Sequence, residues 1–181
     1  MDNKAIDVLY AGRFIELVSL SGWEYARRSN ATGVAAILPV HTDGRLVLIE
    51  QVRPAAGGPV IEWPAGLVGD EGDAESHLDA AKRELLEETG YEAKVWELVG
   101  EGMSSAGLTD EAIVFYLAKD LMPSTEGGGV GGENITKHEI LPDELTGWIE
   151  EMKRVGKKLD LKVYAGLGML NQDTKEDQDG S

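Results

Sequence analysis

The stretch from residue 73 to residue 89 constrains the fold of this chain more than any other part of the sequence. It is rich in good helix formers and carries apolar residues at helical spacing, namely Leu78, Ala81 and Leu85. Gly90 follows at the point where a helix C-terminus favours a residue that is free to adopt a positive φ angle. The pattern predicts a helix that packs its apolar face against a core.

Three glutamates of this predicted helix share one of its faces. Glu84, Glu87 and Glu88 stand at positions i, i+3 and i+4, so their carboxylates converge. Their mutual repulsion destabilises a helix unless a cation gathers them, and Mg²⁺ binds a few carboxylates together with water and phosphate oxygens. Arg83 lies four residues before Glu87 and can orient it, while Glu75 can support the loop that leads into the helix. The alternative is a solvated acidic helix, since charged runs usually face water.

The segment resembles the Nudix box, which is written Gly-x5-Glu-x7-Arg-Glu-U-x-Glu-Glu-x-Gly-U, with U a bulky aliphatic residue. Every fixed position is matched by the run Gly69-x5-Glu75-x7-Arg83-Glu84-Leu85-x-Glu87-Glu88-x-Gly90-Tyr91. Tyr91 departs from the pattern at a packing position, which puts no ligand in doubt. The resemblance implies a Mg²⁺-dependent hydrolase, with Mn²⁺ as a possible substitute. Its implied metal ligands are Glu84, Glu87, Glu88 and the backbone carbonyl of Ala65.

The remaining pattern predicts the elements around this helix. Runs typical of strands cover 33–40, 45–52, 95–99 and 112–118. Two helices are predicted at 142–155 and from Asp160, and the glycine-rich run 126–133 is predicted to be a mobile loop. With the resemblance, these elements imply an α/β fold, a Nudix α/β/α sandwich with a mixed sheet. The predicted divisions are an N-terminal antiparallel β region for dimerisation and base contact (1–32), the Nudix domain (33–170) and a disordered tail (171–181).

Composition narrows the classes of function. The net charge of −16 argues against binding a nucleic acid polymer through a basic surface, and the absence of cysteine excludes thiolate metal sites and cysteine nucleophiles. The N-terminus has acids where a signal peptide has basic residues, and no apolar stretch reaches the length of a membrane span. We therefore expect a cytoplasmic protein with no membrane partner, which needs metal ions and a few placed arginines to attract an anionic substrate.

Residues outside the box narrow the substrate. Gln51-Val-Arg-Pro54 and Ile61-Glu-Trp-Pro-Ala-Gly66 resemble the group of ADP-ribose pyrophosphatases and nucleoside diphosphate sugar hydrolases. In that group the arginine matched by Arg53 contacts the diphosphate. Gly22-Trp-Glu-Tyr-Ala-Arg-Arg28 resembles its N-terminal segment, which implies that Trp23 stacks on the base and that Arg28 reaches the phosphates across a homodimer. Core packing is the alternative for Trp23.

The resemblance also places a catalytic glutamate on a flexible loop after the box. Glu133, which follows the glycine-rich run, matches that place and is the predicted general base, with Glu87 as the second candidate and a solvated loop glutamate as the alternative. Glu139 is a weaker candidate because its strand is predicted to point it outward. Arg83 joins Glu133 and Glu87 in the predicted catalytic set through its orienting role. The run 105–111, which ends in Glu111, resembles a turn followed by an acid in the same group, or is an ordinary turn between strands.

One further pair of residues favours a substrate class. Asp160 and Lys162 form an Asp-x-Lys that resembles the nucleoside diphosphate sugar hydrolases, whereas the ADP-ribose enzymes lack this lysine. We therefore predict Mg²⁺-dependent hydrolysis of a nucleoside diphosphate sugar to a nucleoside monophosphate and a sugar phosphate. An ADP-ribose pyrophosphatase is the nearest alternative. Alternatives of other classes are a non-catalytic Nudix-like nucleotide sensor and an acidic metal-buffering domain.

Overall fold

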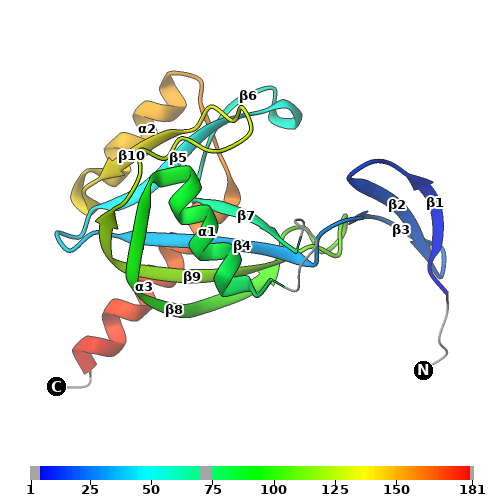
Figure 1. Cartoon of the computed structure of the whole chain (residues 1–181), viewed down its shortest axis with the longest axis horizontal. Coiled ribbons are helices and arrows are strands. Elements are labelled where there is room, and N and C mark those ends of the chain that lie inside the picture. The colour runs from blue at the N-terminus through cyan, green and yellow to red at the C-terminus, as the bar shows by residue number, and fades with distance from the viewer. Residues whose placement is uncertain (1–4, 70–74, 180–181) are drawn as a thin grey trace.

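A computed structural model describes residues 5–69 and 75–179, which form a small N-terminal sheet and a three-layer domain (Figure 1). In the N-terminal part the strands are β1 (Asp7–Ala11), β2 (Ile15–Leu20) and β3 (Trp23–Arg28). The domain contains β4 (Gly33–Val40), β5 (Leu46–Arg53), η1 (Pro54–Ala56), β6 (Gly58–Glu62), β7 (Ala65–Val68), α1 (His77–Thr89), β8 (Tyr91–Met103), β9 (Ala112–Pro123), β10 (Thr136–Ile140), η2 (Pro142–Glu144), α2 (Leu145–Arg154), β11 (Lys158–Leu159) and α3 (Leu161–Asp179).

The domain is built on one mixed sheet. Its strands run in the order β11-β6-β5-β4-β9-β8, while β10 pairs with β5 and β7 pairs with β4. The β4–β9 and β11–β6 pairs are parallel and the other pairs are antiparallel. Strand β4 is buried along almost its whole length, as expected for a central strand that is covered on both faces.

Alternate residues of β4 supply the two cores. Ala35 and Ile37 face the layer of α1, whereas Ala36 and Leu38 face the layer of α2 and α3, because side chains alternate across a strand. The second core includes Trp63, whose indole N–H donates to the carbonyl of Val163 in α3 at 3.3 Å. The sandwich predicted from the sequence is thus confirmed, with α1 on one face of the sheet and the two C-terminal helices on the other (Figure 1).

Local sequence sets the ends of α1. The helix begins after Ser76, whose hydroxyl accepts a hydrogen bond from the backbone N–H of Asp79, and ends at Gly90, whose φ is 76°. Residues 73 and 74 of the predicted helix lie outside the described residues. The predicted strands 95–99 and 112–118 are parts of the longer hairpin of β8 and β9. The backbone of α3 continues through 171–179, where the sequence predicts a tail. The segment 172–178 contains no Gly or Pro that would end the helix.

The N-terminal sheet stands apart from the domain (Figure 1). Its β3 is tied to the segment between β8 and β9 by the hydrogen bond from the backbone N–H of Ala26 to the carbonyl of Leu108, at 2.8 Å. Most apolar side chains of this sheet are exposed, among them Val8, Tyr10, Phe14, Ile15 and Trp23, whereas Val18 is fully buried. A sheet with this much exposed apolar surface is typical of an interaction surface.

A hydrogen-bonded cluster of Glu50, His138 and Lys157, the polar latch, holds the segment after α2 against the central sheet. The Glu50 carboxylate on β5 accepts hydrogen bonds from Lys157 Nζ at 2.5 Å and from His138 Nε2 at 2.9 Å. Burial of Glu50 opposes ionisation, but these hydrogen bonds outweigh it and hold the pKa of Glu50 below its usual range. The latch joins β5, β10 and the chain that leads into β11.

We predict that Glu50→Gln lowers the free energy of unfolding at pH 7 by about 1–3 kcal/mol, because it removes a charged acceptor from two partly buried donors. A carboxylate with a lowered folded pKa stabilises the fold above its unfolded pKa, about 4.3 for glutamate, and this contribution disappears as the pH falls through the folded pKa. Urea unfolding of both proteins at pH 7 and below pH 4 measures the difference.

The matched control is Glu151→Gln, which removes an exposed ion pair with Arg154 on α2. That change is expected to cost less than about 1 kcal/mol. Equal stability losses in the two variants, or a loss at Glu50 that stays constant with pH, would contradict the latch.

Candidate active site

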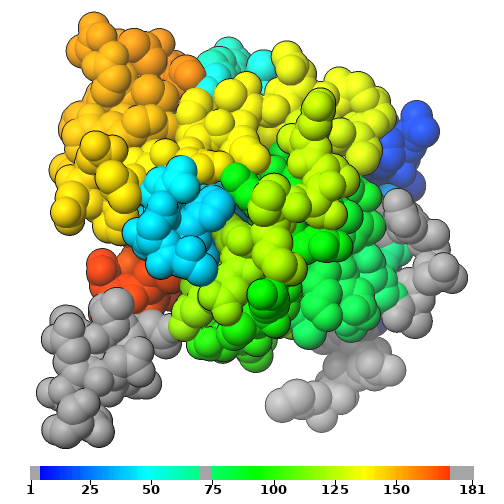
Figure 2. Space-filling model, turned by 60° about the vertical axis from the view of Figure 1, so that its left-hand side comes forward, coloured from blue at the N-terminus to red at the C-terminus, as the bar shows by residue number. Residues whose placement is uncertain are grey.

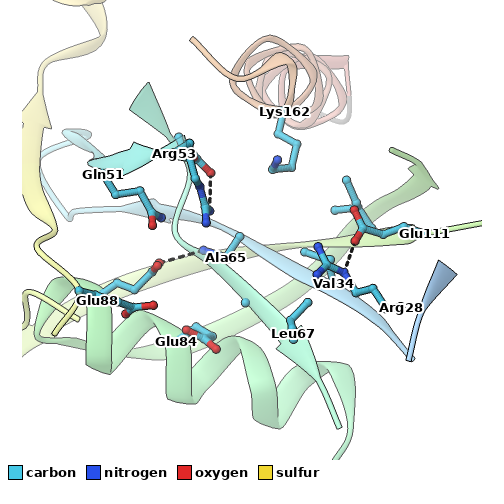
Figure 3. A pocket seen from close by; sticks show the side chains of 14 residues that line it. Arg28, Val34, Gln51, Arg53, Ala65, Leu67, Glu84, Glu88, Glu111 and Lys162 are labelled. Carbon is cyan, nitrogen blue, oxygen red and sulfur yellow. Dashed lines mark hydrogen bonds and ion pairs between the residues drawn. The ribbon is translucent and has the colours of Figure 1, made fainter. Parts of the chain in front are cut away.

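A polar cavity of about 300 Å³ opens between α1, the central strands and the start of α3 (Figure 3). Segments far apart in the sequence contribute its walls. The lining residues are Arg28, Val34, Gln51, Arg53, Glu62, Ala65, Gly66, Leu67, Glu84, Glu88, Glu111, Ile113, Glu133 and Lys162. The cavity therefore gathers most of the predicted site residues, with Glu84 and Glu88 from α1 and three cations from the other elements.

Two box glutamates project from α1 into the cavity (Figure 3). Glu88 is almost fully buried, and its Oε2 accepts a hydrogen bond from the backbone N–H of Ala65 at 2.9 Å. Burial raises the pKa of Glu88 to about 9, and the negative charges of Glu84 and Glu133 add to that effect. Burial likewise raises the pKa of Glu84, against the opposing effect of Arg83. Ionising such closely spaced carboxylates requires positive charge beside them.

Glu87, the third box glutamate, is directed toward Arg83 and does not line the cavity. The Arg83 guanidinium contacts three glutamates, with N–O distances of 3.1 Å to Glu75, 2.6 Å to Glu84 and 3.4 Å to Glu87. The hydrogen bonds with Glu75 and the charges around it raise the pKa of Arg83, and Arg83 lowers the pKa of Glu75. These contacts agree with the predicted orienting role of Arg83 and the predicted supporting role of Glu75.

The oxygen donors at the cavity suit a hard cation, although the structure does not bring a complete set of side-chain ligands together. Among the described residues, no group of three or more His, Asp or Glu side chains is arranged to hold a metal ion. Glu84 and Glu88 supply oxygen donors within the cavity, which are the donors that hard divalent ions prefer. The structure shows Ala65 contacting Glu88 through its N–H, and the predicted role of its carbonyl stays a prediction.

Gly66 makes room for Glu84, a role that the sequence did not reveal. A Cβ atom at position 66 would lie 1.9 Å from Glu84 Oε1 and 2.0 Å from its Cδ. Strand β7 therefore passes against the carboxylate of α1 with no space for any side chain at this position. The only signal in the sequence is that a glycine stands inside a strand, where it often marks a close approach of backbone to another group.

Each cation at the cavity is held by an acid. Arg28 Nε lies 2.5 Å from Glu111, and Arg53 makes two hydrogen bonds, of 2.7 and 2.9 Å, with the buried Glu62. The hydrogen bond to Glu62 raises the pKa of Arg53. The third cation, Lys162, has its Nζ 2.8 Å from Asp160. Sequence reasoning missed Glu62 and Gln51, although a glutamate between the apolar residues Ile61 and Trp63 was a signal for the former.

Glu133 lines the cavity from the loop between β9 and β10. Its Oε2 accepts a hydrogen bond from the backbone N–H of Val130 at 3.2 Å. Glu139 lies on β10 and does not line the cavity. It is not simply turned outward as predicted, because its carboxylate is bound by Arg45 at 2.5 Å and by the Tyr91 hydroxyl.

Trp23 lies on the N-terminal sheet, outside the cavity, with 69% of its surface exposed. The alternative that Trp23 packs in the core is therefore wrong for this chain. Arg28, on the same strand, lines the cavity of its own chain, so its placement there involves no second subunit.

A model of the Nudix domain family matches residues 30–155, which is more than half of the chain. The chain belongs to the Nudix family. The family predicted from the sequence is thus confirmed, and Nudix enzymes generally use divalent metal ions.

Three curated relatives are between 29% and 33% identical to this chain. A "Methanol dehydrogenase activator" of Bacillus methanolicus is 29% identical, with 86% of each chain covered. An "ADP-ribose pyrophosphatase" of Bacillus subtilis is 30% identical, with 67% of this chain and 68% of the relative covered. A "GDP-mannose pyrophosphatase" of Yersinia pestis is 33% identical, with 75% and 71% covered.

A solved structure described as an "ADP compounds hydrolase" shares the fold. Its TM-score is 0.75 at 18% sequence identity, over 96% of this chain and 93% of that chain. Within the described residues, no helix has the length and apolar character needed to cross a membrane.

We predict that Gly66→Ala weakens the binding of Mg²⁺ or Mn²⁺ by roughly tenfold or more, because a Cβ atom would displace Glu84 from the cavity. Calorimetric titration of the purified protein with Mn²⁺ measures this change. The matched control is Gly58→Ala, since a Cβ atom at position 58 meets no atom within 4 Å. Unchanged metal affinity in Gly66→Ala would show that the place of Glu84 beside β7 does not matter for the cation.

Proposed function

We propose that this Nudix chain hydrolyses the pyrophosphate bond of nucleoside diphosphate sugars, releasing a nucleoside monophosphate and a sugar phosphate. The observation that carries the proposal is the division of one cavity into two halves. Two carboxylates with raised pKa, Glu84 and Glu88, stand on α1, and cations from β3, β5 and α3 face the same space. A divalent metal ion at the two carboxylates would compensate their negative charge. A diphosphate between that ion and the cationic side chains would then be bound from both sides.

We assign Mg²⁺ to the acidic half, with Mn²⁺ as a possible substitute. Glu84 and Glu88 would hold it from the cavity wall, and the proposed further ligands are Glu87 and the carbonyl of Ala65. A bound divalent cation would neutralise phosphate charge and acidify water. For Glu87 to join this set, its carboxylate has to leave the guanidinium of Arg83, which it contacts at 3.4 Å. That contact is the longest of the three that Arg83 makes with glutamates.

The chain's own side chains would bind and orient the diphosphate. Arg53 and Arg28 present guanidinium groups whose planar forks match phosphate oxygens, and both are held in place by acids. Lys162 would reach a phosphate or sugar oxygen from the start of α3. Holding these groups in position before substrate binds reduces the entropy lost on binding.

Glu133 is our proposed general base, and Glu87 is the second candidate. Glu133 lines the cavity from a loop, and the hydrogen bond from Val130 N–H leaves its other carboxylate oxygen able to accept a proton from water. Glu87 faces Arg83 instead, so its carboxylate is already engaged in an ion pair. The position of Glu133 inside the cavity therefore favours it.

The choice of substrate rests on Lys162 and on the relatives. Lys162 lines the cavity, and Asp160, which is not among the lining residues, orients the lysine at 2.8 Å. One relative is a GDP-mannose pyrophosphatase and another is an ADP-ribose pyrophosphatase. We favour the nucleotide sugars because Lys162 gives a cation beyond the two arginines. ADP-ribose is the second candidate substrate.

We further propose that two copies pair through the N-terminal sheets. Trp23 lies outside the cavity of its own chain and is exposed, as are the apolar residues of β1. Pairing would bury this apolar surface and would bring Trp23 near the cavity of the partner, where an indole face can stack on a base.

We predict that purified protein with Mg²⁺ releases sugar phosphates from GDP-mannose and ADP-glucose, and that Glu88→Gln lowers kcat/KM at least about a hundredfold by removing a buried carboxylate. Products from these sugars, ADP-ribose and nucleoside triphosphates would be separated by chromatography. The control is Glu92→Gln, an exposed glutamate at the start of β8 that does not line the cavity. Turnover of ADP-ribose alone would favour the second substrate, and binding without any turnover would favour a nucleotide sensor.

For the pairing, we expect the double variant Val8→Glu and Tyr10→Glu to be monomeric in light scattering and the unaltered chain to be dimeric, because the charges lie on the exposed apolar strand β1. Trp23→Ala should raise KM roughly tenfold, since stacking on a base contributes about 1–3 kcal/mol. The control is Val155→Glu, which changes an exposed apolar residue at the end of α2. A monomeric unaltered chain would end the pairing proposal.

A further inference from the structure

The loop between β9 and β10 is anchored on the C-terminus of α1. Backbone N–H groups of Gly128 and Gly129 donate to the carbonyls of Glu88 and Glu87, at 3.1 and 2.9 Å. Ser124 and Thr125 N–H groups donate in the same way to the carbonyl of Gly90, at 2.9 and 3.1 Å. The last carbonyls of a helix have no partner within the helix, and here the loop that carries Glu133 supplies those partners.

Close backbone contact fixes where the loop meets the helix. A Cβ atom at Gly127 would lie 2.5 Å from the backbone nitrogen of Gly90, and a Cβ atom at Gly90 would lie 2.3 Å from the carbonyl oxygen of Thr125. Ile135, near the end of the loop, is buried. In the sequence these glycines predict a mobile loop, whereas in the structure they let the loop pack against the helix.

Lys137, the second residue of β10, completes this anchor. Its Nζ donates to the carbonyl of Thr89 at 2.8 Å, so the ammonium group sits at the negative end of the α1 dipole. The same Nζ lies 4.0 Å from the centre of the Tyr91 ring, which is favourable for a cation over an aromatic face. One side chain therefore joins the strand after the loop to the residues that end the box helix.

Tyr91, the residue that departs from the box pattern, is also connected to Lys137 through Glu139. Its hydroxyl donates to Glu139, which is also bound by Arg45, and the Lys137 Nζ lies 3.9 Å from Glu139 Oε1. Burial and the contact with Glu139 raise the pKa of Tyr91 to about 12, so the phenol keeps its proton and remains a donor. The ring of Tyr91 is packed at right angles to the ring of His41.

These contacts join three segments on one face of the molecule. In Figure 2 the yellow surface of the loop and β10 adjoins the green surface of α1 and β8, beside the light-blue turn that leads into β5. Arg45 on that turn, Tyr91 on β8 and Lys137 with Glu139 on β10 are the residues that connect them. An aliphatic residue at position 91 would offer neither the ring face nor the hydroxyl.

We propose that Lys137, held between Tyr91 and Glu139, is a positioning residue that fixes the Glu133 loop relative to the carboxylates of α1. The proposal rests on the proposed function in one respect, namely that Glu133 acts in the reaction. Lys137 touches neither the cavity nor its lining acids. Its effect passes through the loop backbone, which is bonded to the carbonyls of Glu87 and Glu88.

The test compares Lys137→Met with Lys137→Arg. Methionine keeps an apolar stem but loses the ammonium, whereas arginine keeps a cation that can reach the Thr89 carbonyl and the Tyr91 ring. We expect Lys137→Met to lower kcat about tenfold or more with KM changed less than about threefold, because misplacing a catalytic group acts on the chemical step. Lys137→Arg should recover most of kcat. Tyr91→Leu, which restores the usual aliphatic residue, should lower kcat in the same direction.

Hydrogen exchange of peptides covering 124–135, measured by mass spectrometry, reports on the anchor without any substrate. Lys137→Met should exchange faster in this loop by about tenfold, and Lys137→Arg should not. The matched control is Lys153→Met, which removes a lysine on α2 that also lies over a tyrosine, at 6.0 Å from the centre of the Tyr164 ring. That change should leave both readouts as in the unaltered protein.

The outcomes separate the two proposals. If the unaltered protein turns over no nucleotide, the proposed function fails, and loop exchange still decides whether Lys137 is the anchor. Faster exchange with unchanged kcat would overturn the positioning role, as would unchanged exchange and kcat in Lys137→Met. Should Lys137→Met prove unfolded by circular dichroism, the same criteria apply to Tyr91→Leu.

Discussion

Burial of Glu84 and Glu88 between α1 and β7 is the constraint on which the rest of the site depends. Burial raises the pKa of both carboxylates, and the negative charge of Glu84 raises the pKa of Glu88 further. Two features make this arrangement possible. Gly66 leaves room for Glu84, and the Ala65 N–H donates to Glu88. Burying these acids destabilises the fold unless a cation compensates their charge, and such a cost is typical of a functional site.

The other charged groups around these two acids form ion pairs with one another. Arg83 holds Glu75, Glu84 and Glu87 on one side of α1. Across the cavity Arg53 is held by Glu62, and Arg28 by Glu111. Because each cation already has a carboxylate partner, a chain with a net charge of −16 can present fixed positive groups to an anionic substrate. This arrangement agrees with an enzyme better than with an acidic metal buffer, which would have no use for oriented cations.

The structure also gives a reason for the conformation of the loop that carries Glu133. Its glycines allow it to pack on the C-terminal carbonyls of α1, and Lys137 ties the following strand to the same helix end. The two cavity carboxylates of α1 and the loop of the proposed base are therefore both attached to the C-terminal half of this helix. The exposed N-terminal sheet is attached to the domain near the same cavity through Arg28, which connects the proposed pairing surface to the site.

The sequence by itself determined the box helix, the Nudix family and the mixed α/β/α sandwich, because helical spacing and the fixed positions of the box are local patterns. It also identified Arg53, Lys162 and Glu133, all of which line the cavity. Only the tertiary structure decided that Gly66 makes room for Glu84 and that Tyr91 binds Lys137. Each of these depends on contacts between segments distant in the chain, and the spacing of residues along one segment carries no information about them.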